Sequence, residues 1–263
     1  MSIEVKNLSF AYGEREILHD ISFTIKKGEF VSILGSNGVG KSTLFRCILG
    51  LLPDYKGEIL IEAKDIKKLS VKELSRLVAY IPQNTSPAFN YTVEDIVLMG
   101  TTSSLGAFKS PGKEEMERVQ WAMEKMGIEK LRKRSFNRIS GGERQLAVIA
   151  RALVQQAGIL MLDEPTASLD FGNQMLVLTQ AKALAAEGYT VIQTTHNPEH
   201  SYMFSDRVLA LKDGRLLKEG NTKEIITKEV IDRLYGISVE VPKLFDDRAR
   251  VCIPSDVALG HEI

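Results

Sequence analysis

The stretch Gly35–Thr43 constrains this chain more than any other, because it matches the phosphate-binding loop pattern G-x-x-x-x-G-K-[ST]. Its context fits as well. Residues 30–34 form a short apolar run suited to a buried strand, and residues 44–49 continue as a helix with Gly50 available near its end. The residues of the loop are Gly35, Ser36, Asn37, Gly38, Val39, Gly40, Lys41, Ser42 and Thr43.

A strand, a glycine-rich loop and a helix in this order predict an anion site. Free backbone N–H groups and the positive end of the helix dipole converge on one point, and the glycines let the backbone approach phosphates closely. We expect Lys41 to reach the β- and γ-phosphates of a nucleotide and the Ser42 hydroxyl to ligate Mg²⁺. The alternative is an accidental glycine-rich turn, against which the flanking strand and helix argue.

Length and composition narrow the class of protein. A chain of 263 residues forms one large α/β domain or two small ones. The formal net charge is zero, so nothing in the charge balance suggests a nucleic-acid binder, and no nucleic-acid partner is expected. Cys47 and Cys252 show no disulfide or metal spacing, which is compatible with a reducing compartment.

Two features bear on location. Glu4 and Lys6 interrupt any apolar run at the start, so no signal peptide is expected. No segment approaches the ~20 apolar residues that span a bilayer. We therefore expect a soluble intracellular protein that owes any membrane role to a partner.

Strand-like and helix-like segments alternate through most of the chain, which predicts an α/β fold with a largely parallel sheet. Near the N-terminus, Ile21, Phe23 and Ile25 alternate with polar residues and predict a half-buried strand, with a partner strand over residues 3–10. Further strands are expected over residues 57–61, 78–81, 159–162, 189–195 and 207–211.

Two regions differ from this alternation. Residues 92–156 are predicted to be mainly helical; the methionine-bearing stripe of 113–127 is expected in the core, and the basic residues of 130–138 on a solvated face. Beyond residue 224 we expect one more helix through 231–235, strands over 239–241 and 250–253, and a frayed tail from 255 to 263.

Charged side chains follow two of the predicted buried strands. Asp163 and Glu164 end the apolar run 159–162, and His196 ends the strand 189–195. The carboxyl ends of parallel strands form one sheet edge, where ligands bind in open α/β sheets. Because an unpartnered buried acid pair is costly, we expect a cation to neutralise it, with Asp163 orienting Mg²⁺ and Glu164 free to activate a water. The alternatives are a helix-capping acid pair and a structural histidine.

Two further stretches have open interpretations. Tyr12, in a loop-like Ala-Tyr-Gly, is either a surface residue or an aromatic plate for a base. Ser140-Gly141-Gly142 opens a helix and forms either a second anion site or only a cap and turn.

Taken together, the motifs resemble an ATP-binding cassette (ABC) nucleotide-binding subunit from about residue 2 to residue 225. The phosphate loop, Gln83, Ser140-Gly141-Gly142-Glu143, Asp163-Glu164, Ser168-Leu169-Asp170 and His196 occur in that family's order and spacing. The family signature is usually Leu-Ser-Gly-Gly-Gln, and Ile-Ser-Gly-Gly-Glu departs from it mildly.

The resemblance implies a P-loop NTPase (RecA-like) core with a mainly parallel sheet, an N-terminal antiparallel β region and an inserted α-helical subdomain. Residues 1–225 then form the nucleotide-binding domain, with the helical subdomain at about 92–156. Residues 226–263 form a C-terminal extension that packs on the domain or trails from it.

The resemblance also implies roles for the site residues. Tyr12 stacks on adenine, Gln83 touches the metal and the attacking water, and His196 reaches the γ-phosphate. Two chains pair head to tail, so that ATP lies between one phosphate loop and the signature Ser140–Glu143 of the other copy, with Asp170 nearby. A homodimer with two ATP and Mg²⁺ sites is therefore expected.

The tail motif Leu234-Tyr235-Gly236-Ile237-x-Val239-x-Val241 and the signature resemble importers of metal chelates such as iron–siderophore, haem, cobalamin and some oxyanions. The implied function is ATP hydrolysis coupled to uptake through an integral-membrane permease. A solute-binding protein serves as an indirect partner, and the subunit lies peripherally on the cytoplasmic face of the membrane. The alternatives are a soluble ABC ATPase in assembly or repair, an exporter subunit and a non-catalytic nucleotide sensor.

Overall fold

A computed structural model describes residues 2–83, 89–103 and 110–259. The strands are β1 Ile3–Tyr12, β2 Arg15–Ile25, β3 Phe30–Leu34, β4 Lys56–Ile61, β5 Lys64–Asp65, β6 Val78–Ile81, β7 Ile159–Asp163, β8 Thr190–Thr195, β9 Arg207–Lys212, β10 Arg215–Asn221, β11 Val239–Glu240, β12 Lys243–Leu244, β13 Ala249–Arg250 and β14 Ile253–Pro254. The α-helices are α1 Lys41–Ile48, α2 Val71–Leu77, α3 Val93–Leu98, α4 Lys113–Lys125, α5 Gly141–Val154, α6 Phe171–Ala186, α7 Pro198–Phe204, α8 Thr222–Ile225, α9 Lys228–Tyr235 and α10 Ser255–Ala258. Short 3-10 helices cover Ile66–Lys68, Met99–Ser103, Glu129–Leu131 and Phe136–Arg138.

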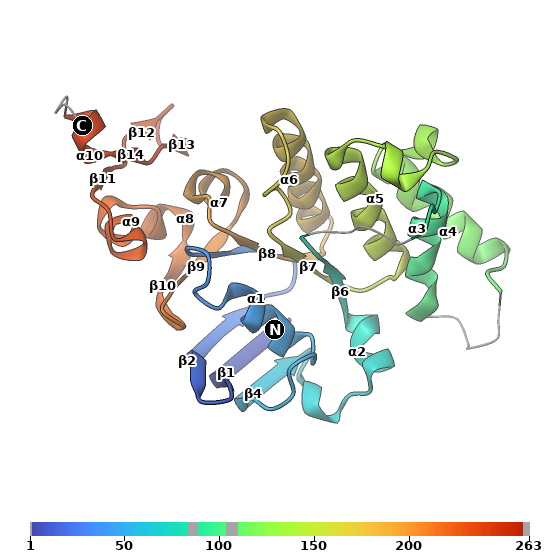
Figure 1. Ribbon diagram of the computed structural model, residues 1–263, viewed down its shortest axis with the longest axis horizontal. Coiled ribbons are helices and arrows are strands. Elements are labelled where there is room, and N and C mark those ends of the chain that lie inside the picture. Colours follow the sequence, from blue (N-terminus) through green and yellow to red (C-terminus); the bar gives the residue numbers. More distant parts are fainter. Residues whose placement is uncertain (1, 84–88, 104–109, 260–263) are drawn as a thin grey trace.

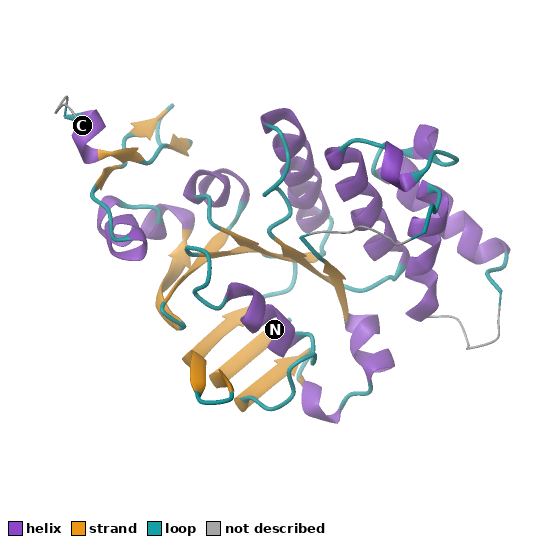
Figure 2. Cartoon of the chain, in the orientation of Figure 1, coloured by secondary structure: helices purple, strands orange, loops and turns teal. Residues whose placement is uncertain are grey.

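Two sheets form the body of the molecule (Figures 1 and 2). The larger sheet has the order β10-β9-β3-β8-β7-β6 and is parallel except for β10, which pairs antiparallel with β9. The smaller sheet has the order β2-β1-β4-β5 and is antiparallel. Both the parallel sheet and the antiparallel N-terminal region predicted from the sequence are confirmed.

Apolar layers on both faces of the large sheet explain its unbroken hydrophobic runs. In β7, Ile159 and Met161 point into the core shared with α1 and the antiparallel sheet, whereas Leu160 and Leu162 point into the core beneath α5 and α6. A strand buried on both faces needs no polar alternation. Every residue of β7 is accordingly buried.

The helical arm is built from α3, α4 and α5, at the right of Figure 1. Thr92 begins α3 with a capping box: its hydroxyl accepts from the Asp95 N–H, and the Asp95 carboxylate accepts from the Thr92 N–H. Val119, Met123 and Met126 of the predicted stripe are buried, as expected. Most of the basic residues of 130–138 are exposed, as expected, and Arg132 and Lys133 also pair with the buried Glu94.

The C-terminal segment differs from the sequence-based expectation. The strand predicted over 250–253 is wrong, because β13 and β14 are separate two-residue strands that pair with β12 and β11. The predicted frayed tail begins instead with α10, whose Ser255 is buried; residues 260–263 lie outside the described residues. Ile225 and Ile226 share one apolar cluster with Leu34 of β3, and the domain boundary at 225 stays a prediction. Within the described ranges no helix is long and apolar enough to cross a membrane.

Candidate nucleotide site

The phosphate loop connects β3 to α1, as the sequence predicts, and two of its glycines are required by geometry. A Cβ on Gly35 would lie 2.4 Å from the Leu211 carbonyl oxygen. Gly40 has φ +105°, and its Cβ would lie 2.8 Å from the Leu18 side chain. No other residue fits these positions without displacing the loop.

This geometry makes a stability prediction. Gly40→Ala should lower the free energy of unfolding by about 1–3 kcal/mol, because alanine is strained at this φ and meets Leu18. Gly38→Ala is the matched control: φ there is +83°, but no atom lies within 4 Å of the added Cβ. Urea unfolding of both variants measures the difference. Equal losses for the two variants would show that the contact with Leu18 contributes nothing.

Lys41 is folded back over the loop that carries it. Its Nζ donates to the carbonyls of Gly35 at 2.8 Å and Ser36 at 3.0 Å, and it pairs with Glu164 Oε1 at 3.3 Å. The side chain is almost fully buried. Burial lowers the pKa of Lys41, and the negative charge of Glu164 opposes that shift.

Asp163 ends β7 and is surrounded by hydroxyl groups. Its Oδ1 accepts from Thr194 Oγ1 at 2.6 Å and from Ser42 Oγ at 3.2 Å, and its Oδ2 accepts from Tyr80 Oη at 3.2 Å. Burial next to this carboxylate raises the pKa of Tyr80 to about 12, so the phenol stays protonated and donates. The predicted neighbourhood of Ser42 and Asp163 is therefore present.

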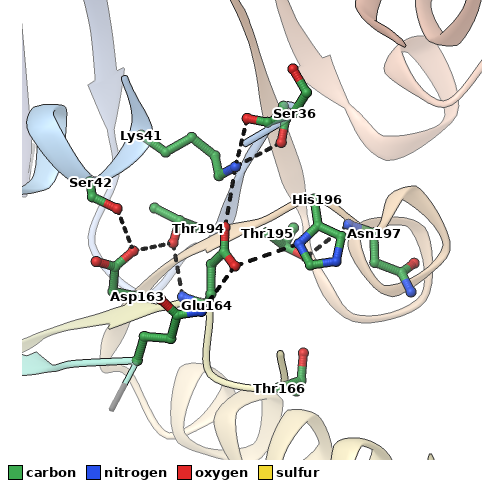
Figure 3. Close-up of polar contacts among 12 residues, drawn as sticks. Ser36, Lys41, Ser42, Asp163, Glu164, Thr166, Thr194, Thr195, His196 and Asn197 are labelled. Atoms are coloured by element: carbon green, nitrogen blue, oxygen red, sulfur yellow. Dashed lines mark hydrogen bonds and ion pairs between the residues drawn. The ribbon is translucent and has the colours of Figure 1, made fainter. Parts of the chain in front are cut away.

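Glu164 is the convergence point of the site (Figure 3). Its backbone lies at φ +44°, which turns the side chain away from that of Asp163. Besides Lys41, its carboxylate contacts Gln83 Nε2 at 3.4 Å and His196 Nδ1 at 3.6 Å. The sequence predicted a cation beside the Asp163–Glu164 pair. Lys41 brings a positive charge to Glu164, and three hydroxyls donate to Asp163. The expectation that Asp163 orients Mg²⁺ stays a prediction.

A cavity of about 470 Å³ opens over the phosphate loop. Tyr12 stands at its wall, 45% exposed and edge-on to Phe10. A cavity of this size falls in the range of small-molecule sites. Its lining residues are Tyr12, Arg15, Ile17, Asn37, Gly38, Gly40, Lys41, Ser42, Thr43, Gln83 and Glu164.

The predicted signature residues do not line that cavity. Ser140 caps α5, its Oγ accepting from the Glu143 N–H at 3.2 Å while Glu143 accepts from the Ser140 N–H at 2.7 Å. Gly142 packs against Asn173, and Asp170 begins α6 by accepting from the Asn173 N–H. Gly141 lines a separate cavity of about 130 Å³ that reaches Gln83 and Glu164. Within one copy, no signature residue lines the cavity over the phosphate loop, although the two cavities share Gln83 and Glu164.

Comparisons with known proteins agree with this geometry. Residues 18–167 match the ABC transporter family, which is more than half of the chain. The chain belongs to the ABC transporter family. An ATP-binding protein assigned to iron-chelatin transport in Helicobacter pylori is 38% identical over 242 residues, covering 91% of this chain and 95% of that protein. The iron(3+)-hydroxamate import ATP-binding protein FhuC of Bacillus subtilis is 31% identical over 259 residues, covering 97% and 96%.

A solved structure of a transporter has the same fold. An inward-facing transporter described as of the metal-chelate type superposes with a TM-score of 0.86 at 30% identity, covering 97% of this chain and 99% of that one. The fold is thus that of ABC ATPases, with a P-loop core and a helical subdomain. The protein binds nucleotide and hydrolyses ATP.

The residues of this ABC ATPase fit Mg²⁺ by the chemistry of their donors. Ser42 Oγ and an Asp163 carboxylate oxygen lie 3.2 Å apart beside the loop. Mg²⁺ in nucleotide sites takes one or two protein oxygens together with phosphate oxygens and waters, so an all-protein cage is not required. Among the described residues, no group of three or more His, Cys, Asp or Glu side chains could hold a metal ion.

Sequence reasoning missed two residues of the site, Thr194 and Tyr80. Thr194 Oγ1 accepts from the Glu164 N–H at 2.9 Å and donates to Asp163, so it fixes both acids. Its signal was the strand register, because Asp163 and Thr194 are direct neighbours across β7 and β8. Until the pairing of the strands is known, a threonine near the end of a strand does not stand out as a partner of the two acids.

Proposed function

We propose that this ABC ATPase drives import of a metal chelate, as one of two identical subunits bound to a membrane permease. The single observation that carries the mechanism is the contact of Lys41, Gln83 and His196 with the Glu164 carboxylate. The cargo class rests on the two curated relatives of iron transport and on the metal-chelate type transporter.

The proposed reaction is in-line attack of water on the γ-phosphate of ATP. Glu164 takes the proton of that water, and Gln83, which contacts Glu164, orients the water and touches the metal. Lys41 and His196 stabilise the charge that develops on the transferred group. Ser42 and Asp163 would hold Mg²⁺, which would supply positive charge to the phosphates. Tyr12 provides a face for adenine at the other end of the cavity.

The position of the signature supports the proposed homodimer. Residues Ser140–Glu143 lie outside the phosphate-loop cavity of their own copy. In the proposed head-to-tail pair, the signature of one copy closes the ATP cavity of the other, with Asp170 at the same face. Binding of ATP then brings the copies together, and hydrolysis separates them.

The permease has a candidate docking surface in an apolar groove of about 550 Å³, between the segment that follows α1, the helix α2 and the C-terminal end of α5. Leu51 and Val71 at its border are 62% and 88% exposed. Arg151 lines the groove with no ion-pair partner in the described part of the chain, and burial lowers its pKa. This chemistry fits a short apolar helix of a permease loop that brings a carboxylate or a helix C-terminus to Arg151. The subunit would then sit peripherally on the cytoplasmic face of the membrane.

This docking surface gives a second prediction. Val71→Glu should weaken co-purification with the permease about tenfold or more, because a charge would be buried in an apolar interface. Val257→Glu is the matched control, since Val257 is an exposed valine on α10, outside the groove. If both variants retain the permease equally in detergent, the groove is not the docking surface.

Cargo and direction are tested in vesicles that contain the permease and this ATPase, supplied with a solute-binding protein. Uptake of an iron–siderophore, haem or cobalamin that requires ATP on the side of this subunit supports the proposal. Extrusion of the same cargo would identify an exporter, and retention of ATPase activity with no polytopic partner would point to a soluble assembly or repair ATPase.

A further inference from the structure

A hydroxyl of the C-terminal segment reaches the turn that carries His196. Tyr235, the last residue of α9, donates a hydrogen bond of 2.7 Å from Oη to the backbone carbonyl of His196. The apolar face of α9 anchors this contact, because Val230, Ile231 and Leu234 are buried in one cluster with residues of β3 and β9. Burial raises the pKa of Tyr235, so the phenol stays protonated and keeps its donor.

The turn after β8 is held on the side of the phosphate loop as well. The Thr195 carbonyl accepts from the Gly35 N–H at 3.2 Å, and the Asn197 N–H donates to Thr195 Oγ1 at 3.0 Å. The His196 peptide thus lies between the phosphate loop and α9. In Figure 3 its imidazole extends from this turn toward Glu164.

The imidazole of His196 makes few polar contacts of its own. Its side chain is 51% exposed, and within the described ranges its only ion-pair or hydrogen-bond contact is Glu164 Oε2, 3.6 Å from Nδ1. The position of the ring therefore depends on the backbone that carries it. The carbonyl of His196 and its Cα lie in one peptide plane, so a hydrogen bond that holds the carbonyl also holds the Cα from which the ring extends.

We propose that Tyr235 is a positioning residue for His196, through which the C-terminal segment sets the geometry of the ATP site. The inference rests on the proposed role of His196 at the γ-phosphate. It also assigns a role to Tyr235, a residue of the tail motif that does not take part in the proposed reaction. Loss of one neutral hydrogen bond lets the peptide rotate and lowers the fraction of molecules with a correctly placed ring.

The chain offers a matched control in Tyr202 of α7. Its Oη also joins α7 to the C-terminal segment, donating to the Asp247 carbonyl at 2.6 Å and to Asp247 Oδ1 at 2.9 Å. Arg250 holds the same carboxylate. Tyr202→Phe therefore removes a hydroxyl from the same junction without touching the carbonyl of His196.

The test is ATP turnover of the permease complex carrying Tyr235→Phe, Tyr202→Phe, His196→Ala, or Tyr235→Phe combined with His196→Ala. Tyr235→Phe should lower kcat about three- to tenfold and leave the KM for ATP unchanged. Tyr202→Phe should keep the parental kcat, and the double variant should match His196→Ala alone, because the contact acts only through the ring. A parental kcat for Tyr235→Phe, or the same further loss in the double variant, overturns the proposal.

A second readout needs no turnover. The chain has four histidines, so the ring signals of His196 can be assigned by NMR in the isolated protein. Tyr235→Phe should shift the His196 signals and leave those of His19 on β2 unchanged, whereas Tyr202→Phe should leave both unchanged. Unshifted His196 signals in Tyr235→Phe contradict the positioning contact. If the signals shift but His196→Ala hydrolyses ATP at the parental rate, the positioning contact stands and the γ-phosphate role of His196 is wrong.

Discussion

Glu164→Gln is expected to bind ATP at least as tightly as the parent and to hydrolyse it about 10²–10⁴-fold more slowly. Glutamine keeps the shape of the side chain and can still accept from Lys41, which lies 3.3 Å from the carboxylate. It cannot take a proton from water. It also removes a negative charge near the site proposed for the γ-phosphate, so binding is not weakened. The ATP-bound dimer should accumulate.

The measurement for Glu164→Gln is phosphate release from the permease complex, together with ATP binding by calorimetry. Glu58→Gln is the control, because Glu58 pairs with Lys6 on the surface of the antiparallel sheet. Turnover of Glu164→Gln at the rate of Glu58→Gln would show that another group, or water alone, accepts the proton.

The second large effect is expected from Lys41→Ala, which should raise the Kd for ATP roughly 10- to 150-fold. The Nζ group supplies charge-assisted hydrogen bonds worth about 1.5–3 kcal/mol, and each 1.4 kcal/mol corresponds to about tenfold in affinity. The loss is reinforced because Glu164 keeps its negative charge with its Lys41 partner gone.

Calorimetric titration with ATP measures the Kd of Lys41→Ala, and Lys68→Ala serves as control, because the Lys68 side chain is 83% exposed. A thermal melt of the nucleotide-free protein must accompany the titration, since Lys41 also binds two loop carbonyls. A Kd within threefold of the control, in a variant that melts normally, would remove Lys41 from the phosphate site.

The sequence predicted those parts of the fold in which burial produces a clear run of apolar residues. β3 and β6 match the predicted ranges because both are short, mainly apolar runs whose residues are nearly all buried. The short C-terminal strands could not be predicted. Two-residue pairs such as β12 and β13 are too short to show a period, and they depend on Asp247 and Arg250 meeting Tyr202 of α7.

In the candidate site, too, some residues were predicted from the sequence and others were not. The motifs identified Lys41, Asp163, Glu164 and His196, and the structure brings their side chains to one sheet edge (Figure 3). Their protein partners were not predicted, because Thr194, Tyr80 and Tyr235 act through hydroxyls whose direction depends on strand register and helix packing. Lys41 and the hydroxyls that donate to Asp163 lower the cost of burying the two acids, and the expected Mg²⁺ at Asp163 stays a prediction.

Cysteine crosslinking tests most directly the central claim, that each ATP site needs two copies. Asn37→Cys, at the phosphate loop, and Ser140→Cys, at the signature, are made separately in Glu164→Gln protein that also carries Cys252→Ser. Mixed with ATP, the two should form a disulfide-linked pair, whereas either alone, or the mixture without nucleotide, should not. If ATP is bound and hydrolysed by the parent while no mixture crosslinks, the signature of one copy does not meet the phosphate loop of the other.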